Sequence, residues 1–185
     1  MVKINKLQDI ISRMNSSLNL ALGKFKKENK GVKCGAYKQH LDMIVSEWNT
    51  EDILRCMHKK DKQHTAQRIA ENMESIECMD PDMRSHSLYN AGLITLYIGG
   101  IEEAKELFVE ALAFADKEDD IMHYHHLEFL YNNAESIRDI LESAVKDYAS
   151  NYDIGSDIRY LEDAHQIEDF DEMRRLPLLD YGKAN

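Results

Sequence analysis

The sequence contains little of what interrupts a helix. It has only 2 prolines and 8 glycines in 185 residues, and no segment alternates β-branched or aromatic residues with polar ones, as half-buried strands do. Its apolar fraction of 43% is enough for a buried core, and its length suits one domain. These features predict an all-α fold of antiparallel helical hairpins, either a short solenoid or a helical bundle, with about seven helices.

The sequence also lacks the apolar runs of a membrane protein. No stretch approaches the roughly 20 apolar residues that a membrane-spanning helix needs, and the first residues have neither the apolar run nor the cleavage site of a secretory signal. The three cysteines, Cys34, Cys56 and Cys78, form no CxxC pair, which is typical of free thiols in a reducing compartment. We therefore expect a cytoplasmic protein without a membrane partner.

Known catalytic and cofactor-binding motifs are missing as well. The sequence has no GxSxG, no HExxH and no GxxxxGK[ST], the patterns of serine hydrolases, zinc peptidases and phosphate-binding loops. Its 8 histidines are scattered along the chain. We therefore expect a protein that is not an enzyme and that binds no cofactor.

The densest group of potential metal ligands is His123, His125 and His126. Successive residues of a helix turn by about 100°, so these three side chains point in different directions. We interpret them as surface or interface residues, with metal ligation as the alternative.

A second potential metal-binding pattern is Glu162-x-x-His165, with Asp61-x-x-His64 as a weaker copy. Helical bundles that hold two metal ions use a Glu-x-x-His on each of two helices and single glutamates on two others. The sequence offers no clear candidate for those single glutamates. We therefore assign no metal site here, and a metal-dependent helical enzyme stays an alternative.

Positive charge is concentrated near the start of the chain. Residues 1–40 contain nine Lys/Arg and two acidic residues, a net charge of +7. Because the whole chain carries −11, the rest of it carries −18. An acidic body repels nucleic acid, so we expect a protein or peptide partner and not a nucleic acid.

The first 25 residues carry an apolar seam. Spacings of three and four residues alternate along it, as in a heptad repeat, and predict a helix over residues 4–25. The seam either packs on the domain's own core or joins a second copy of the chain in a homo-oligomer. The residues assigned to such an oligomer contact are Ile4, Leu7, Ile11, Met14 and Leu18.

A lysine-rich segment with glycines at positions 31 and 35 follows this helix. Because this composition is typical of an exposed loop, we divide the chain there. The predicted parts are an N-terminal helix and basic loop over residues 1–35, a helical domain over residues 36–176 and a tail over residues 177–185. Within the domain, periodicity predicts helices over residues 36–48, 65–79 and 121–148. Asp80 before Pro81, Asn49 or Thr50, and Ser156 are the expected helix caps.

The clearest pattern lies between residues 88 and 115. Two apolar helical segments are separated there by Gly99 and Gly100, and so short a turn makes the helices antiparallel neighbours. Ala91 and Gly92 are small enough to let the two backbones approach closely.

The segment LYNAGLITLYIGGIEEAKELFVEAL resembles one tetratricopeptide repeat, over about residues 85–118. Its matching positions are Leu88, Ala91, Gly92, Gly99, Ala104, Phe108 and Ala111. Thr95 replaces the usual tyrosine of the first helix, and Asp116 stands where a closing proline is common. Shifts by a period of about 34 residues place Glu74 opposite Phe108 and His126 opposite Gly92, so the neighbouring segments match poorly. A short divergent solenoid and a bundle with one such hairpin both stay open.

The resemblance implies a peptide-binding groove lined by first-helix residues, namely Tyr89, Asn90, Leu93 and Tyr97. We therefore expect a non-catalytic protein–protein interaction or adaptor module, with self-association through its N-terminal helix as one form of that role. The first alternative is an acidic regulator or inhibitor that binds the basic, nucleic-acid-binding surface of a partner protein. The second is the metal-dependent helical enzyme.

Overall fold

The computed structural model describes residues 2–175, and their side chains from residue 6 to residue 166 except 47 and 48. This part contains eight α-helices and no β-strand, which confirms the predicted all-α class. The predicted tail, residues 177–185, lies outside the described residues. None of the helices that the structure describes is long and apolar enough to cross a membrane.

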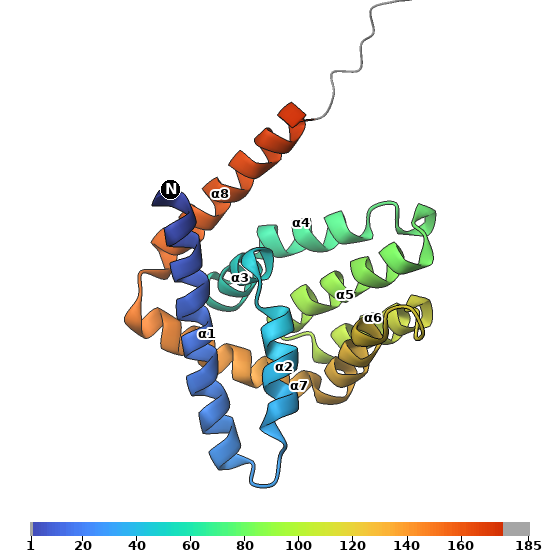
Figure 1. The fold of residues 1–185 in the computed structure, drawn as a ribbon, viewed down its shortest axis with the longest axis horizontal. Coiled ribbons are helices and arrows are strands. Elements are labelled where there is room, and N and C mark those ends of the chain that lie inside the picture. Colours follow the sequence, from blue (N-terminus) through green and yellow to red (C-terminus); the bar gives the residue numbers. More distant parts are fainter. Residues whose placement is uncertain (1, 176–185) are drawn as a thin grey trace, which may run out of the picture.

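The chain begins with two antiparallel helices, α1 (Val2–Glu28) and α2 (Cys34–Ile44), joined by the lysine-rich loop (Figure 1). The helix predicted over residues 36–48 is split, because Val45 is extended and Ser46 caps a new helix. The Ser46 side chain accepts a hydrogen bond from the backbone N–H of Asn49, so Asn49 and Thr50 lie inside this helix and do not cap it.

That new helix, α3 (Glu47–Ile53), continues into a π-helical segment, η1 (Leu54–Lys59), which ends at the left-handed residue Lys60. Asp61 then caps α4 (Lys62–Met73) by accepting the N–H of His64. The prediction of a helix over residues 65–79 is therefore right in its centre and wrong at both ends. A short 3₁₀ turn, η2 (Ile76–Cys78), follows the left-handed Ser75.

The predicted hairpin is present as α5 (Pro81–Tyr97) and α6 (Ile101–Phe114). Asp80 caps α5 and Pro81 is its first residue, as expected. Gly99 has φ +92°, a left-handed conformation that residues with a side chain rarely adopt, and it turns the chain. A Cβ at Gly92 would lie 2.6 Å from Cε1 of Phe108, so only glycine allows this approach of the two helices.

The longest helix is α7 (Ile121–Asn151), with Asp120 as its cap. It is kinked at Asn133, whose side-chain Nδ2 donates to the carbonyl of Phe129 while its Oδ1 accepts the Tyr37 hydroxyl. The last helix, α8 (Ile154–Arg175), begins two residues before the predicted cap Ser156, because Asp153 accepts the N–H of Ser156.

Helices α4, α5, α6 and α7 pack in chain order, each against the next (Figure 1). Helices α1 and α2 pack on α7 from the other side, while α8 runs past the start of α1 and away from the body. One apolar core joins these elements, from Ile10 and Met14 in α1 to Leu161 in α8, and α4 packs Ile69 and Met73 against it. The N-terminal helix thus shares its core with the helices that follow the predicted boundary at residue 35.

Candidate functional site

The residues expected to line a peptide groove lie mostly inside the protein. Leu93 and Tyr97 are 0% exposed, and Tyr89 and Asn90 are half-buried. The hydroxyl of Tyr89 is hydrogen-bonded to Nε2 of His126 at 2.9 Å. Helix α5 therefore offers a partner no open groove at these four positions in this structure.

The seam assigned to an oligomer contact is also used within the chain. Met14 and Leu18 are buried in the shared core, and Leu7 and Ile11 are half-buried against it. The side chain of Ile4 lies outside the described residues. A second copy would find only the partly exposed edge of this seam.

The three histidines near the start of α7 point to different neighbours, as the helical geometry predicts. His125 is exposed and pairs with Glu128 at 3.1 Å. His123 is buried, with Nε2 2.9 Å from the hydroxyl of Ser85, and burial lowers its pKa. Because that hydroxyl gives its single hydrogen to the carbonyl of Ala111, it accepts from His123. Ser85 therefore lacks the free hydrogen-bonded base that a nucleophilic serine needs.

His126 lies at a junction of three helices. Its Nδ1 is 2.7 Å from Nδ1 of His40 in α2, and its Nε2 contacts Tyr89 in α5. Burial, together with His40 and His123 nearby, lowers the pKa of His126 to about 3. Both ring nitrogens of this neutral histidine are engaged in holding helices together, so neither is free to bind a metal ion.

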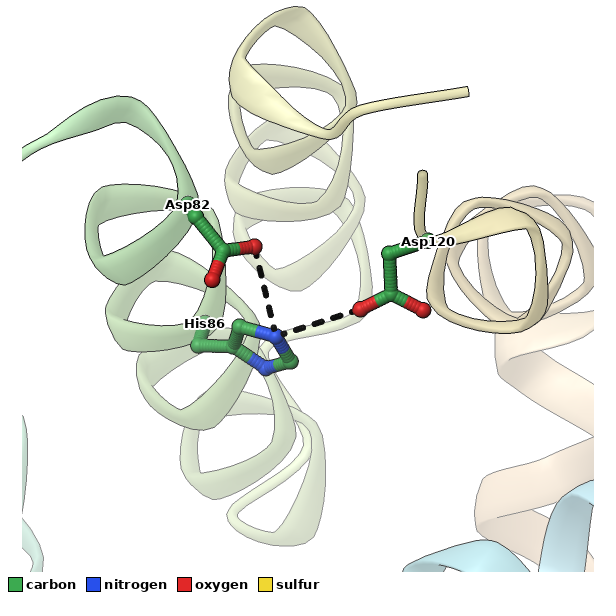
Figure 2. Close-up of side chains that lie close together, drawn as sticks. All are labelled: Asp82, His86 and Asp120. Atoms are coloured by element: carbon green, nitrogen blue, oxygen red, sulfur yellow. Dashed lines mark ion pairs between the residues drawn. The ribbon is translucent and has the colours of Figure 1, made fainter. Parts of the chain in front are cut away.

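Sequence reasoning missed another group of potential metal ligands, which lies where α5 and α7 begin. Asp82 and His86, one turn apart in α5, lie beside Asp120, the cap of α7 (Figure 2). The i, i+4 spacing of Asp82 and His86 was a usable signal. Asp120 was not predictable as their neighbour, because only the packing of α5, α6 and α7 brings it there.

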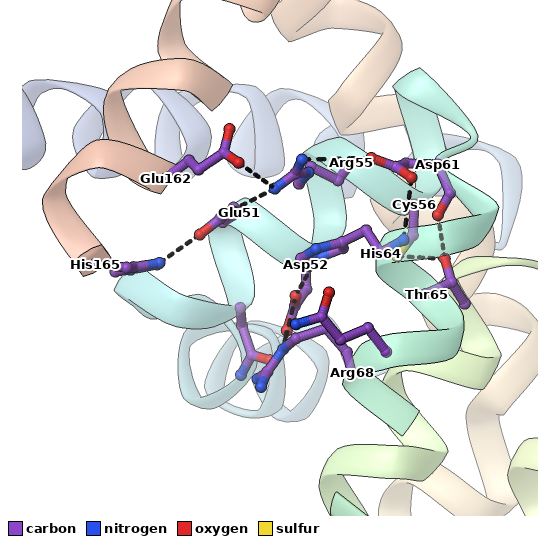
Figure 3. Close-up of polar contacts among 12 residues, drawn as sticks. Glu51, Asp52, Arg55, Cys56, Asp61, His64, Thr65, Arg68, Glu162 and His165 are labelled. Carbon is purple, nitrogen blue, oxygen red and sulfur yellow. Dashed lines mark hydrogen bonds and ion pairs between the residues drawn. The ribbon is translucent and has the colours of Figure 1, made fainter. Parts of the chain in front are cut away.

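The two Asp/Glu-x-x-His segments do come together, around α3 and η1 (Figure 3). Glu51 is ion-paired with His165 of α8, and Arg55 lies 3.0 Å from its other carboxylate oxygen. The neighbouring Asp52 accepts Nε2 of His64 at 2.7 Å and Nε of Arg68 at 3.2 Å. Each of two consecutive buried carboxylates thus holds one histidine and one arginine.

Arginine occupies the position that a metal ion would need in this cluster. The guanidinium of Arg55 is 3.0 Å from Glu51, 3.4 Å from Asp61 and 3.8 Å from Glu162. A metal ion bound to these carboxylates would lie close to the positively charged guanidinium of Arg55, which would repel it. The arrangement is therefore a structural ion network that fastens α8 and α4 to α3, not a di-metal site.

Cys56 completes this region. Its thiol lies 3.2 Å from the hydroxyl of Thr65, which donates to the carbonyl of Asp61 and so accepts from the thiol. Burial raises the pKa of Cys56 to about 11. A protonated, enclosed thiol is a poor nucleophile, so Cys56 serves packing.

An open groove lies between α6 and α7 and is lined by six residues of α6 and by Tyr131 of α7. It has a volume of about 420 Å³, and its apolar floor is formed by Val109, Ala113 and Tyr131. Val109 and Tyr131 are 47% and 40% exposed, so the floor of the groove is apolar surface open to a partner. The rim carries three carboxylates at four-residue spacing, Glu102, Glu106 and Glu110, and one cation, Lys105, which pairs with Glu102 at 3.1 Å and leaves Glu106 and Glu110 as the carboxylates open to a partner.

Comparison with known proteins gives no match to a protein-family model, to a curated protein or to a solved structure.

Proposed function

We propose that the protein is a non-catalytic interaction module that binds a basic amphipathic helix of a partner protein in the groove between α6 and α7. The observation that carries this proposal is the combination of an exposed apolar floor with a row of carboxylates in one open groove. Elsewhere, the reactive side chains of Ser85, Cys56 and His126 are held by structural hydrogen bonds.

The geometry of the rim defines the partner. Glu102, Glu106 and Glu110 follow one stripe of α6, so their carboxylates are about 6 Å apart along the helix axis. A second helix that lies along α6 presents lysines or arginines at the same interval when they recur every fourth residue. Its apolar face then covers Val109 and Tyr131. This is the helix-in-groove mode of recognition, with charge setting orientation.

The acidic character of the chain supports the same partner chemistry. A net charge of −11 attracts basic segments over long range and accelerates their encounter. The alternative is an acidic regulator that covers a basic, nucleic-acid-binding surface of a partner. Such a regulator would bind through charge alone and would not need the apolar floor. The salt dependence of the affinity distinguishes the two proposals, since purely electrostatic binding weakens steeply as ionic strength rises.

The test uses a synthetic peptide with leucine along one face and lysine at every fourth residue, added to the ¹⁵N-labelled protein. We expect the backbone signals of residues 102–113 and those around Tyr131 to shift, with binding that persists in part at high salt. A peptide with the same composition in scrambled order is the control for nonspecific attraction.

Two double variants with the same change in net charge make the test specific. Glu106→Lys with Glu110→Lys reverses the rim, whereas Glu74→Lys with Glu77→Lys reverses two exposed carboxylates beyond the end of α4. We expect the rim variant to weaken binding at least tenfold and the control variant to change it less than twofold. Equal weakening by both variants would refute a groove-specific site.

A further inference from the structure

The α5–α7 cluster, defined as Asp82, His86 and Asp120, combines three ligand-type side chains from two helices that are distant in the chain (Figure 2). We propose that this cluster binds a divalent transition-metal ion, with Zn²⁺ as the ion that its ligands fit best. The ligands are Nε2 of His86 and one carboxylate oxygen from each aspartate.

The distances within the cluster fit ligands that share one ion. Nε2 of His86 is 3.8 Å from Oδ1 of Asp82 and 3.6 Å from Oδ2 of Asp120, and the three ligand atoms all lie within 4.8 Å of one another. These separations are too long for hydrogen bonds, which have N···O distances of about 2.9 Å. Tetrahedral zinc with bonds of about 2.1 Å separates its ligands by about 3.4 Å. Small shifts of Asp82 and His86, which are exposed, would close the site around the half-buried Asp120.

The structure already holds two of the three ligands in position. Oδ1 of Asp120 accepts the backbone N–H of His123 at 3.1 Å as the cap of α7, which leaves Oδ2 facing His86. The ring of His86 is stacked on the buried ring of His123, with centroids 3.9 Å apart and planes at 22°. Such neighbours outside the ligand shell fix the orientation of metal ligands and increase affinity.

The donor set selects the class of ion. One imidazole with two carboxylates suits Zn²⁺ and its first-row neighbours, whereas Ca²⁺ and Mg²⁺ prefer oxygen ligands alone. Two carboxylates and a neutral imidazole also balance the charge of a divalent cation. Asp82 lines an open cavity of about 780 Å³, so water has access to a fourth coordination position.

A bound ion at this position would tie the first turn of α5 to the first turn of α7. These turns flank the end of the hairpin that is opposite the Gly99 turn, where the described structure has no other ion pair between the two helices. The cluster shares no residue with the α6–α7 groove, so a test of metal binding does not depend on the proposed function.

The experiment titrates Zn²⁺ and Co²⁺ into untagged, chelator-treated full-length protein, with calorimetry for Zn²⁺ and visible absorption for Co²⁺. We expect one ion per chain and a rise in Tm with Zn²⁺. His86→Gln removes the nitrogen ligand, and Asp120→Asn removes a carboxylate while asparagine still caps α7. Each variant should bind at least tenfold more weakly.

His125→Gln is the matched control, because His125 is an exposed histidine near the start of α7 that lies outside the cluster. It should bind like the unchanged protein. Circular dichroism and the Tm of the metal-free variants show whether each is folded. No binding by the unchanged protein, or equal binding by His86→Gln, would overturn the proposal, as would a loss of binding confined to His125→Gln.

Discussion

The α5–α6 hairpin and the region around α3 are stabilised by opposite means. The hairpin is closed by contacts between small and large apolar side chains, above all Gly92 against Phe108. The second region contains a buried charge network, which comprises Glu51, Asp52, Arg55, Asp61, His64, Arg68, Glu162 and His165. Glu51 and Asp52 are 5% and 2% exposed.

Because of this difference, the two regions should respond differently to substitution. Apolar contacts in the hairpin lose stability in proportion to the volume that is removed or added. In the charge network, loss of one buried carboxylate leaves its histidine and arginine partners with fewer opposite charges in a poorly hydrated place, although Arg68 keeps Glu71 at 2.8 Å. We therefore expect the network to be more sensitive to the deletion of a single charge than the hairpin is to the addition of a single methyl group.

The largest expected effect is that of Asp52→Asn. The substitution keeps the shape of the side chain but removes the charge that faces His64 and Arg68. We expect the free energy of unfolding to fall by about 3 kcal/mol, as for other broken buried pairs. Urea denaturation monitored by circular dichroism measures this change.

Asp42→Asn is the matched control, because Asp42 pairs with Lys38 at 3.0 Å on an exposed surface. Exposed pairs contribute at most about 1 kcal/mol, so this variant should unfold close to the unchanged protein. Similar losses for Asp52→Asn and Asp42→Asn would contradict the contrast between the two regions.

The same contrast decides how much of the fold was predictable from sequence. The hairpin was predicted in detail because its determinants, a proline after Asp80, small residues and a glycine turn, act locally. The break at Ser46 was missed because a serine side chain competed successfully with helix continuation. The charge network was not foreseen, because its carboxylates read as surface residues in any pattern based on polarity.

The candidate sites were less predictable than the helices. Local periodicity identified α6 and α7, but it did not show that Val109 and Tyr131 would share a groove. Leu93 and Tyr97 were assigned to a surface by resemblance and lie in the core. A site that joins residues from two helices depends on their relative rotation, which is set by packing at many positions.

The second prediction concerns pH, at the junction where His126 links the hairpin to α2 and α7. The groups that face His126 are His40 from α2, Tyr89 from α5 and His123 from α7. The folded pKa of His126 is about 3, against about 6.5 when unfolded. Between these values the unfolded chain binds the additional proton, so stability falls as pH falls.

We expect His126 alone to remove about 1.6 kcal/mol of unfolding free energy between pH 6.5 and pH 5, because the slope approaches about 1.4 kcal/mol per pH unit only below the unfolded pKa. His40 and His123, whose pKa values burial also lowers, add to this slope. Urea denaturation at half-unit intervals of pH gives the slope. The slope of unfolding free energy against pH counts the protons that the chain takes up on unfolding. His126→Gln should lower this number by nearly one, whereas His125→Gln should leave it unchanged. An unaltered slope in His126→Gln would show that His126 is not buried in its neutral form.

The smallest effect, and the one that examines the hairpin directly, compares two glycine-to-alanine substitutions. At Gly92 the new methyl group would lie 2.6 Å from the ring of Phe108, which is 0% exposed and has little room to move. Overpacking of this kind costs about 2 kcal/mol, and the better helix propensity of alanine recovers about 1 kcal/mol.

Gly23 lies in the interior of α1, where a methyl group would have no neighbouring atom within 4 Å, so Gly23→Ala gains the propensity alone. Urea denaturation should therefore show Gly92→Ala to be less stable by about 1 kcal/mol and Gly23→Ala to be more stable by a similar amount. The same sign for both substitutions would mean that α5 and α6 do not approach as closely as Gly92 and Phe108 indicate.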